Sequence, residues 1–154
     1  MKNSDEYYMK LALEAANEAL SIDEVPIGAL IIDKNENILA KESNKTIKNN
    51  DPTAHAEILA LRKAALKINN YRLTECVLYT TIEPCVMCAG ALVNARIKRL
   101  VYGSTDIRFG GAQTVFNICN NSSLNHQIEI KSDVLSLEAK KLIQDFFKTK
   151  RAKK

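Results

Sequence analysis

The segment Ile27–Ile32 restricts the fold more than any other part of the sequence. It reads Ile-Gly-Ala-Leu-Ile-Ile, a short and continuous apolar run that does not alternate with polar residues. A run of this kind is typical of a strand that is buried on both faces of a sheet. The sheet that contains it therefore needs other elements packed on both of its sides.

The predicted elements around this strand alternate in type. The turn Asp33–Asn37 leads to a return strand at Ile38–Lys41, which completes a hairpin. Asn3 with Glu6 is predicted to cap the first helix, and Thr53 to cap the second. The segment Ser104–Ser123 is predicted to be mostly loop, with room for a short helix near Val115. The other predicted elements are helices at Ser4–Leu20, from Asp51-Pro-Thr53 through Leu66, at Val86–Ala95 and at Leu135–Lys148, and strands at Cys76–Thr80, Lys98–Tyr102 and Ile128–Lys131.

This order of elements predicts the fold class. A helix, a hairpin and then alternating strands and helices indicate an α/β domain with three layers, α/β/α, around a five-stranded mixed sheet. The 154 residues fit one domain with one core, so residues 1–154 are expected to form a single domain.

Composition points to a particular redox environment. Hydrophobic residues make up 46% of the chain and no apolar run approaches the ~18 residues of a membrane span. The polar, acidic start Met1–Tyr8 does not resemble a secretory signal, so we expect a cytoplasmic protein without a membrane partner, in which thiols stay reduced. Four cysteines in that setting indicate metal binding or catalysis before disulfides. Cys76 and Cys119 stand alone and are expected to be small buried apolar residues.

The positive charge is concentrated at one end of the chain. The net charge is +4, from 22 basic and 18 acidic residues. The segment Lys148–Lys154 holds five basic residues in seven. It is either a solvated, frayed end or a contact for a polyanion, and the sequence favours neither.

Two polar motifs open predicted helices. One is Thr53-Ala-His55-Ala-Glu57, and the other is Pro84-Cys85-Val-Met-Cys88. Each follows a loop and lies at the N-terminal mouth of its helix, where polar site residues gather in α/β domains. The spacing of Cys85 and Cys88 puts both sulfur atoms on one face of a helix.

These motifs supply the ligands of a catalytic zinc ion. Cys85 and Cys88 as thiolates and one neutral imidazole give three protein ligands, which leaves the fourth position for water. Of the two histidines, His55 is the better ligand than His126 because Glu57 accompanies it. Two thiolates lower the pKa of a zinc-bound water molecule less than histidine ligands do. A neighbouring base is therefore needed to take a proton from the water, and Glu57 is placed to do so. His126 has no partner motif and is expected to be a surface or core histidine.

The combination H-x-E and P-C-x-x-C resembles the signature of zinc nucleobase deaminases. Over nearly its full length the chain resembles the bacterial tRNA-specific adenosine deaminases of the cytidine deaminase superfamily. The blocks that carry the resemblance are Glu24–Ala29, Asp51–Ile58, Asn70–Leu73, Thr81–Ala91 and Asp145–Phe147.

The resemblance implies a reaction and a set of partners. The enzyme would deaminate adenosine to inosine at the wobble position of a tRNA anticodon. It would bind one zinc ion per chain and act as a homodimer. His55, Cys85 and Cys88 would hold the zinc ion that activates water. Glu57 would pass the proton of that water to ring N1 and then to the leaving amine.

Two further site residues follow from the resemblance alone. Asn44 is either a turn residue or, as the family implies, a contact to the target nucleoside. Asp106 is either a turn-former or the family's aspartate near the nucleic acid. Phe109 departs from the family pattern, so nothing is carried over to the loop around it.

Two other functions remain open at this stage. A deaminase of free bases or nucleosides, of the cytosine or guanine type, shares the zinc motif. A non-enzymatic zinc module that binds RNA is the contrasting class, and Glu57 argues against it because a non-catalytic zinc ion needs no base.

Overall fold

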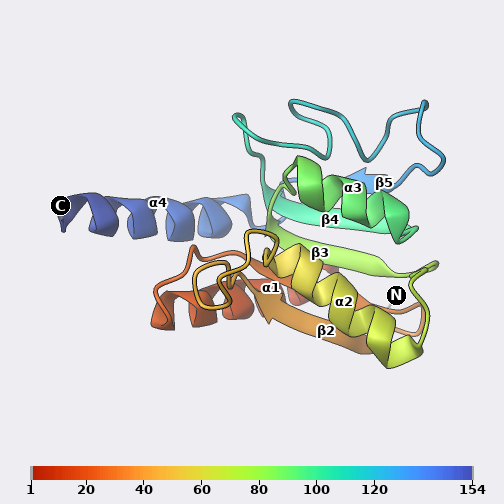
Figure 1. Cartoon of the computed structure of the whole chain (residues 1–154), viewed down its shortest axis with the longest axis horizontal. Helices are drawn as coiled ribbons and strands as arrows, with labels where there is room; N and C mark the ends of the chain where they lie inside the picture. Colours follow the sequence, from red (N-terminus) through yellow and green to blue (C-terminus); the bar gives the residue numbers. More distant parts are fainter. Residues whose placement is uncertain (1, 154) are drawn as a thin grey trace.

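The computed structural model describes residues 2–153 and contains one mixed sheet of five strands (Figure 1). The strand order is β2-β1-β3-β4-β5. β1 pairs antiparallel with β2 and β3, whereas β3, β4 and β5 run parallel. The strands are β1 Gly28–Ile32, β2 Ile38–Ser43, β3 Val77–Ile82, β4 Arg99–Ser104 and β5 Glu129–Lys131.

The sheet is covered on both faces, as the apolar run of β1 predicts. Every residue of β1 is buried. Ala29 and Ile31 belong to one apolar cluster, while Leu30 and Ile32 belong to the cluster on the other side. Because successive side chains of a strand point to opposite faces of the sheet, β1 contributes residues to both apolar clusters.

Helices form the two outer layers. α2 and α3 supply the first cluster, and α1 supplies the second. The start of α4 lies on the side of α1, where Ala139 approaches Gly103 of β4. This is the predicted three-layer α/β/α arrangement with a five-stranded mixed sheet. The helices are α1 Asp5–Ser21, α2 Ala56–Ile68, α3 Val86–Asn94 and α4 Ser136–Ala152.

The predicted helix caps are wrong in detail. α1 is capped by Ser4, whose Oγ accepts a hydrogen bond from Tyr7 N at 3.1 Å, because the helix begins one residue later than predicted. Thr53 does not cap α2, since its N–H and hydroxyl both donate to Asp51 Oδ1 within a turn. α2 begins only at Ala56, so His55 occupies the N-cap position.

Two later segments also differ from the prediction. The region around Val115 contains turns and no helix; Val115 N and Phe116 N both donate to Gly110 O. α4 continues to Ala152 rather than ending at Lys148, so most of the basic segment is helical. Lys154 lies outside the described residues. In Figure 1, α4 extends away from the rest of the molecule, and Ala139 is its one buried residue.

The topology places two helix N-termini at the end of the sheet where the parallel strands β3 and β4 terminate. β3 and β4 are parallel, so the loops that follow Ile82 and Ser104 leave from the same edge. α3 begins there, and α2 begins beside it. No helix within residues 2–153 has the length and apolar character that crossing a bilayer requires.

Candidate active site

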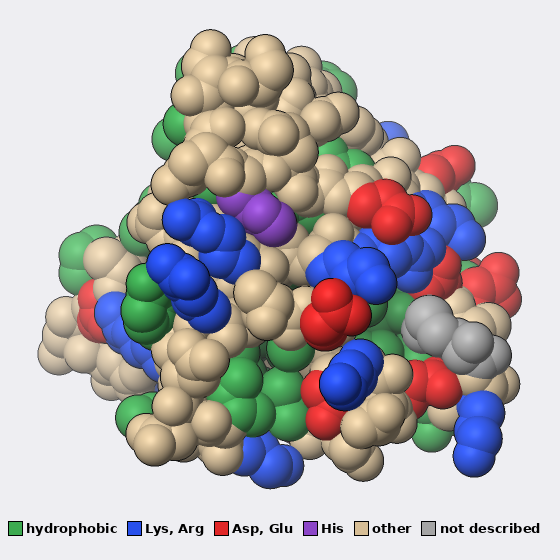
Figure 2. All heavy atoms as spheres, turned by 90° about the vertical axis from the view of Figure 1, so that its right-hand side faces the viewer, with side chains coloured by type: hydrophobic (Ala, Val, Ile, Leu, Met, Phe, Trp, Pro, Cys, Tyr) green, Lys and Arg blue, Asp and Glu red, His purple; other side chains and the backbone are tan. Residues whose placement is uncertain are grey.

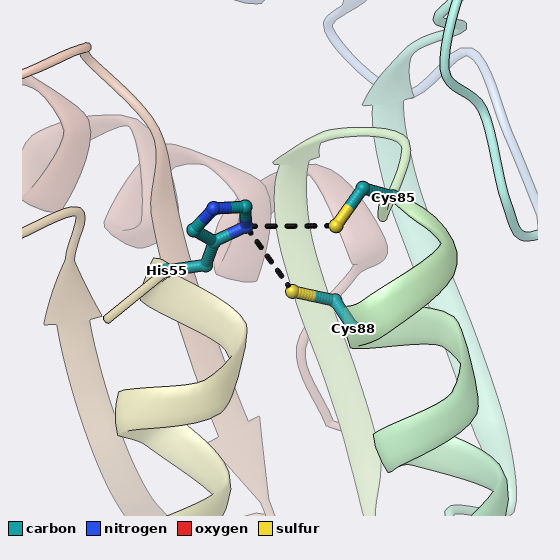
Figure 3. A group of neighbouring side chains, drawn as sticks. All are labelled: His55, Cys85 and Cys88. Carbon is teal, nitrogen blue, oxygen red and sulfur yellow. Dashed lines mark hydrogen bonds between the residues drawn. The ribbon is translucent and has the colours of Figure 1, made fainter. Parts of the chain in front are cut away.

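The N-cap residues of α2 and α3 face each other (Figure 3). His55 is the N-cap of α2 and Cys85 is the N-cap of α3. Neither side chain makes a capping hydrogen bond to its own helix, so both are free to point across the gap between the helices. Cys88 comes from the first turn of α3 and points to the same place.

The three side chains have the spacing of tetrahedral zinc ligands. His55 Nδ1 lies 3.5 Å from the Sγ atoms of both Cys85 and Cys88. Zinc–sulfur and zinc–nitrogen bonds of about 2.3 and 2.0–2.1 Å at a tetrahedral angle place the outer atoms about 3.5 Å apart. All three ligand atoms lie within 4.8 Å of one another. The donor set and its geometry therefore fit a zinc ion.

The pKa values of the two thiols are shifted in opposite directions. The pKa of the Cys85 thiol is lowered to about 4, chiefly because Cys88 hydrogen-bonds to it and also because His55 lies beside it. The same hydrogen bond, together with burial, raises the pKa of Cys88. The hydrogen bond to Cys85 raises the pKa of His55. A lowered thiol pKa favours the thiolate, which is the form that a metal binds.

Glu57 lies in the first turn of α2 and only 4% of its surface is exposed. Burial raises the pKa of its carboxyl group to about 7, and the negative charge of Cys85 adds to that effect. A carboxyl group with a pKa near the working pH can both accept and release a proton. His55 and Glu57 line the same pocket because both lie at the very start of the helix, where residues i and i+2 lean toward its mouth.

The pocket has a volume of about 510 Å³, which is in the range of small-molecule sites. Its walls are largely apolar, and two of the lining side chains, Phe109 and Phe116, are exposed phenylalanines. The lining residues are Ile27, His55, Glu57, Ile82, Glu83, Cys85, Val86, Met87, Asp106, Phe109 and Phe116.

Glu83, which was not predicted as a site residue from the sequence, organises one wall of this pocket. Glu83 is 3% exposed, and its carboxylate accepts hydrogen bonds from the backbone N–H groups of Asp106, Gln113 and Thr114 at 3.0–3.1 Å. The Thr114 hydroxyl donates to it as well. Glu83 therefore ties the loop of residues 105–114 to the end of β3. An acidic residue directly between an apolar strand and Pro84 is the signal that was available.

Two glycines allow this loop to lie against the cysteine segment. A Cβ atom on Gly111 would come within 2.6 Å of the Cys85 carbonyl carbon and of Val86 N. A Cβ atom on Gly110 would come within 2.5 Å of Glu83 Oε1. Gly111 N donates to Pro84 O at 2.8 Å. The wall of the pocket and the segment that begins at Pro84 are consequently in direct backbone contact.

Of the two residues that only the family resemblance indicated, Asp106 lines the pocket and Asn44 does not. Asp106 lines the pocket, and its Oδ1 accepts hydrogen bonds from Arg108 N and Phe109 N. It is therefore a turn-former that also reaches the pocket wall. Asn44 is 5% exposed beside the end of β2 and is not among the lining residues. A contact of either residue to a nucleoside stays a prediction.

The remaining histidine and cysteines lie away from the pocket lining. His126 Nε2 lies 2.7 Å from Ile97 O, which ties its loop to the segment before β4. Burial raises the pKa of Cys76 to about 11 and that of Cys119 to about 12. Both thiols stay protonated at neutral pH, as expected for small buried apolar residues.

This fold and site define a class of protein. Residues 3–151 match the family of MafB19-like deaminases, and the chain belongs to the deaminases.

Relatives narrow the family further. A Haemophilus influenzae protein named tRNA-specific adenosine deaminase is 44% identical over 97% of this chain and 87% of its own length. An Aquifex aeolicus protein of the same name is 42% identical over 93% of each chain. The chain belongs to the family of tRNA-specific adenosine deaminases.

Solved structures agree with this assignment. A structure from a study of A-to-I editing by tRNA:A34 deaminases at the wobble position of transfer RNA superposes with a TM-score of 0.85. It is 37% identical and covers 88% of this chain and 98% of its own. A guanine deaminase from Nitrosomonas europaea superposes with a TM-score of 0.80 at 26% identity, over 93% of this chain and 84% of its own.

Proposed function

We propose that the protein deaminates adenosine to inosine at the wobble position of a tRNA anticodon, with one zinc ion held by His55, Cys85 and Cys88. The observation that carries this proposal is that the donor atoms of His55, Cys85 and Cys88 lie within 4.8 Å of one another, while His55 and Cys85 line the same pocket as Glu57. The relatives that are 42–44% identical carry the name of this activity.

The chemistry divides between the metal and Glu57. A zinc ion held by His55, Cys85 and Cys88 would bind a water molecule and lower its pKa, and Glu57 would be the base that completes its deprotonation. Glu57 would take a proton from the water molecule while the water oxygen bonds to C6 of adenine, and it would deliver that proton to ring N1. Glu57 would then take the remaining proton of the attacking oxygen and deliver it to the exocyclic amine, which leaves as ammonia as the C6–N bond breaks and the C6=O bond of inosine forms. Adenosine and water are thereby converted to inosine and ammonia.

The buried position of Glu57 suits these transfers. Because burial raises its pKa to about 7, neither the protonated nor the ionised form is strongly favoured at neutral pH. The apolar walls of the pocket exclude other water from the base, and the target base has to leave its stack to enter. The unpaired bases of an anticodon loop can be splayed out at little cost.

Three further features belong to this proposal. The described chain acts as one catalytic domain, and two copies form a homodimer, as the family resemblance implies. The basic residues near the tip of α4 form the contact for the tRNA backbone. Figure 2 shows the end of the molecule away from that tip, where basic and acidic side chains are interspersed.

Deamination of a free base is the alternative. It is supported by the superposition with a guanine deaminase, but at 26% identity, below that of the tRNA deaminases. The pocket volume of about 510 Å³ accommodates a base in either case.

One experiment separates these functions. Purified protein is incubated with bulk tRNA, and the tRNA is sequenced for A-to-G changes at each position, with Glu57→Gln as the inactive control. Parallel reactions with guanine, cytosine and adenosine are followed by ammonia release. We expect A-to-G changes at the wobble position and little ammonia from the free compounds. Turnover of a free base without change in tRNA would refute the proposal.

A further inference from the structure

The mouth of the pocket carries an exposed aromatic side chain. Phe109 lines the pocket, yet 63% of its surface is exposed. The neighbouring Ile107 is 82% exposed and does not line the pocket. A phenyl ring has no hydrogen-bonding group, so it can recognise only another apolar or aromatic surface.

The backbone beneath this ring is held in place. Asp106 Oδ1 accepts a hydrogen bond from Phe109 N at 3.0 Å, and Asp106 N donates to Glu83 Oε1 at 3.1 Å. Gly110 N, directly after Phe109, donates to Asp106 O at 3.0 Å. Glu83 is itself buried at the end of β3. The backbone that presents Phe109 is thus fixed relative to the metal ligands, which lowers the entropy lost when a ligand packs on the ring.

The charge beside the ring favours a nucleic acid. Arg108 is exposed next to Phe109, and no ion pair joins it to any residue in the described part of the chain. A cationic side chain adjacent to an exposed ring is the usual pairing in proteins that bind single-stranded RNA, where the cation meets phosphate and the ring stacks on a base. When the target base enters the pocket, a neighbouring nucleotide is left at the mouth, where Phe109 stands.

We propose that Phe109 is a stacking platform for the base of a nucleotide that adjoins the target adenosine in the RNA. The inference rests on the proposed function and adds a substrate-binding residue to it. Stacking on an aromatic ring accepts any base, because every base has a π face. Phe109 therefore strengthens binding of the loop without selecting one neighbouring sequence.

The test compares Phe109→Ala with matched variants on an anticodon stem-loop. Loss of one stacked base should raise KM by about 5- to 150-fold and leave kcat at saturation nearly unchanged, because the contact forms before the chemical step. Phe109→Trp should retain the wild-type KM. Phe109→Leu, which keeps apolar bulk without an aromatic face, should behave like Phe109→Ala. Ile107→Ala, on the same loop, should leave KM unchanged.

Modified RNA identifies the stacked base. Stem-loops with an abasic site on one or the other side of the target adenosine are assayed with wild-type enzyme and with Phe109→Ala. One abasic substrate should raise the KM of the wild-type enzyme as much as the substitution does, and Phe109→Ala should cause no further loss on it. A full additional loss on both abasic substrates would overturn the proposal. Equal losses in Ile107→Ala and Phe109→Ala would also overturn it.

Further measurements separate this proposal from its alternatives. Zinc content and Tm of each variant show whether the site and the fold are intact. A changed sedimentation coefficient in Phe109→Ala, with unchanged KM per active site, would assign the ring to a protein interface and overturn the proposal. An inactive wild-type enzyme on the stem-loop refutes the proposed function; an active one whose KM is insensitive to Phe109→Ala refutes only the stacking platform.

Discussion

A carboxylate lies at the start of a helix at each end of the sheet, but the pKa values of the two groups are shifted in opposite directions. Asp5 is the first residue of α1 and lies beside the amino-terminal end of β4. Glu57 lies in the first turn of α2, at the edge where β3 and β4 end. One is surrounded by cations and hydrogen-bond donors, whereas the other faces a pocket.

Asp5 is fully matched by its partners. Arg99 donates to both of its oxygens at 2.8 Å, Tyr79 OH donates to Oδ1 at 2.8 Å, and Lys131 Nζ lies 3.0 Å from Oδ2. The hydrogen bonds from Arg99 hold the pKa of Asp5 well below its usual value of 3.8. This group stays ionised at any pH at which the protein works, and it joins α1 to three strands.

Glu57 is surrounded differently, and its pKa moves the other way. Burial raises its pKa to about 7, and the adjacent Cys85 thiolate adds to the rise. A fixed charge suits a structural tie, whereas a proton carrier needs a pKa close to the surrounding pH. The comparison shows that the pKa of a carboxyl group at the start of a helix depends on whether Arg and Lys side chains pair with it, as they do with Asp5 and, within residues 2–153, not with Glu57.

The largest expected effect tests the catalytic side of this comparison. Glu57→Gln should lower kcat by about 10²–10⁴ because the amide cannot carry protons. Zinc content should stay near one per chain, since the three ligands are untouched. Steady-state kinetics on an anticodon stem-loop and elemental analysis measure the two quantities. A variant that kept more than about a tenth of the wild-type kcat would show that another group is the base.

The second prediction concerns the metal. Cys88→Ser should weaken zinc binding by more than about 100-fold, because a neutral hydroxyl replaces a thiolate ligand and even groups behind the ligands contribute 10- to 100-fold. Competition with a chromogenic chelator measures the affinity. Cys119→Ser, also a buried cysteine, is the matched control and should bind zinc as the wild type does. Full occupancy in Cys88→Ser would remove Cys88 from the ligand set.

The sequence alone predicted a large part of this arrangement. The continuous apolar run of β1 required cover on both faces of the sheet, and the two short motifs brought His55, Cys85 and Cys88 together. These features depend on local spacing and on residue types with few alternatives. The apolar run and the two motifs can each be recognised within a short stretch of the chain.

Other features could not be predicted, because the residue types fit more than one local structure or because distant residues decide the outcome. Thr53 has the residue type of a helix cap, yet its hydrogen bonds to Asp51 delay α2 until Ala56. Glu83 looks like an ordinary acid in the sequence, and its role appears only because residues 23 to 31 positions away fold back to donate to it. The length of α4 was underestimated because charged residues at a chain end do not distinguish a helix from a frayed segment.

The third prediction tests the structural side of the comparison. Asp5→Asn should destabilise the protein by about 2–4 kcal/mol, because the substitution removes one partner of a largely buried ion pair and leaves Arg99 inadequately matched. Denaturant unfolding measures the change. The kcat on tRNA should remain close to that of the wild type, since Asp5 lies at the other end of the sheet.

The dependence of this effect on pH has a definite sign. The pKa of Asp5 is lowered in the folded protein, so its contribution is fully present above the unfolded value of about 4 and declines as pH falls through the folded pKa. The stability difference between wild type and Asp5→Asn should therefore be constant near neutral pH and shrink below about pH 4. A difference that grew on acidification would contradict the assignment of Asp5 as an ionised partner.

The smallest expected effect concerns the basic segment on α4. Lys150 Nζ pairs with Asp23 and lies 5.5 Å from the centre of the Phe146 ring, whereas no ion pair within residues 2–153 involves Lys148, Arg151 or Lys153. Each phosphate contact contributes about 0.7 to the slope of log K against log salt for single-stranded RNA. Replacing those three residues with Ser should therefore lower the slope by about 2 if all three meet phosphate.

Matched single substitutions sharpen this last prediction. Lys150→Ser should change the slope less than Arg151→Ser, because Asp23 already offsets the charge of Lys150. Lys34 is an exposed lysine in the turn between β1 and β2, which lies at the end of the sheet opposite the pocket. Lys34→Ser should therefore leave the slope unchanged. Binding titrations at several salt concentrations measure all of these values. Because the zinc ligands and Glu57 are untouched, kcat at saturating tRNA should change little in every variant. An unchanged slope in the triple variant would identify the end of α4 as a solvated helix that serves neither of the two ends of the sheet.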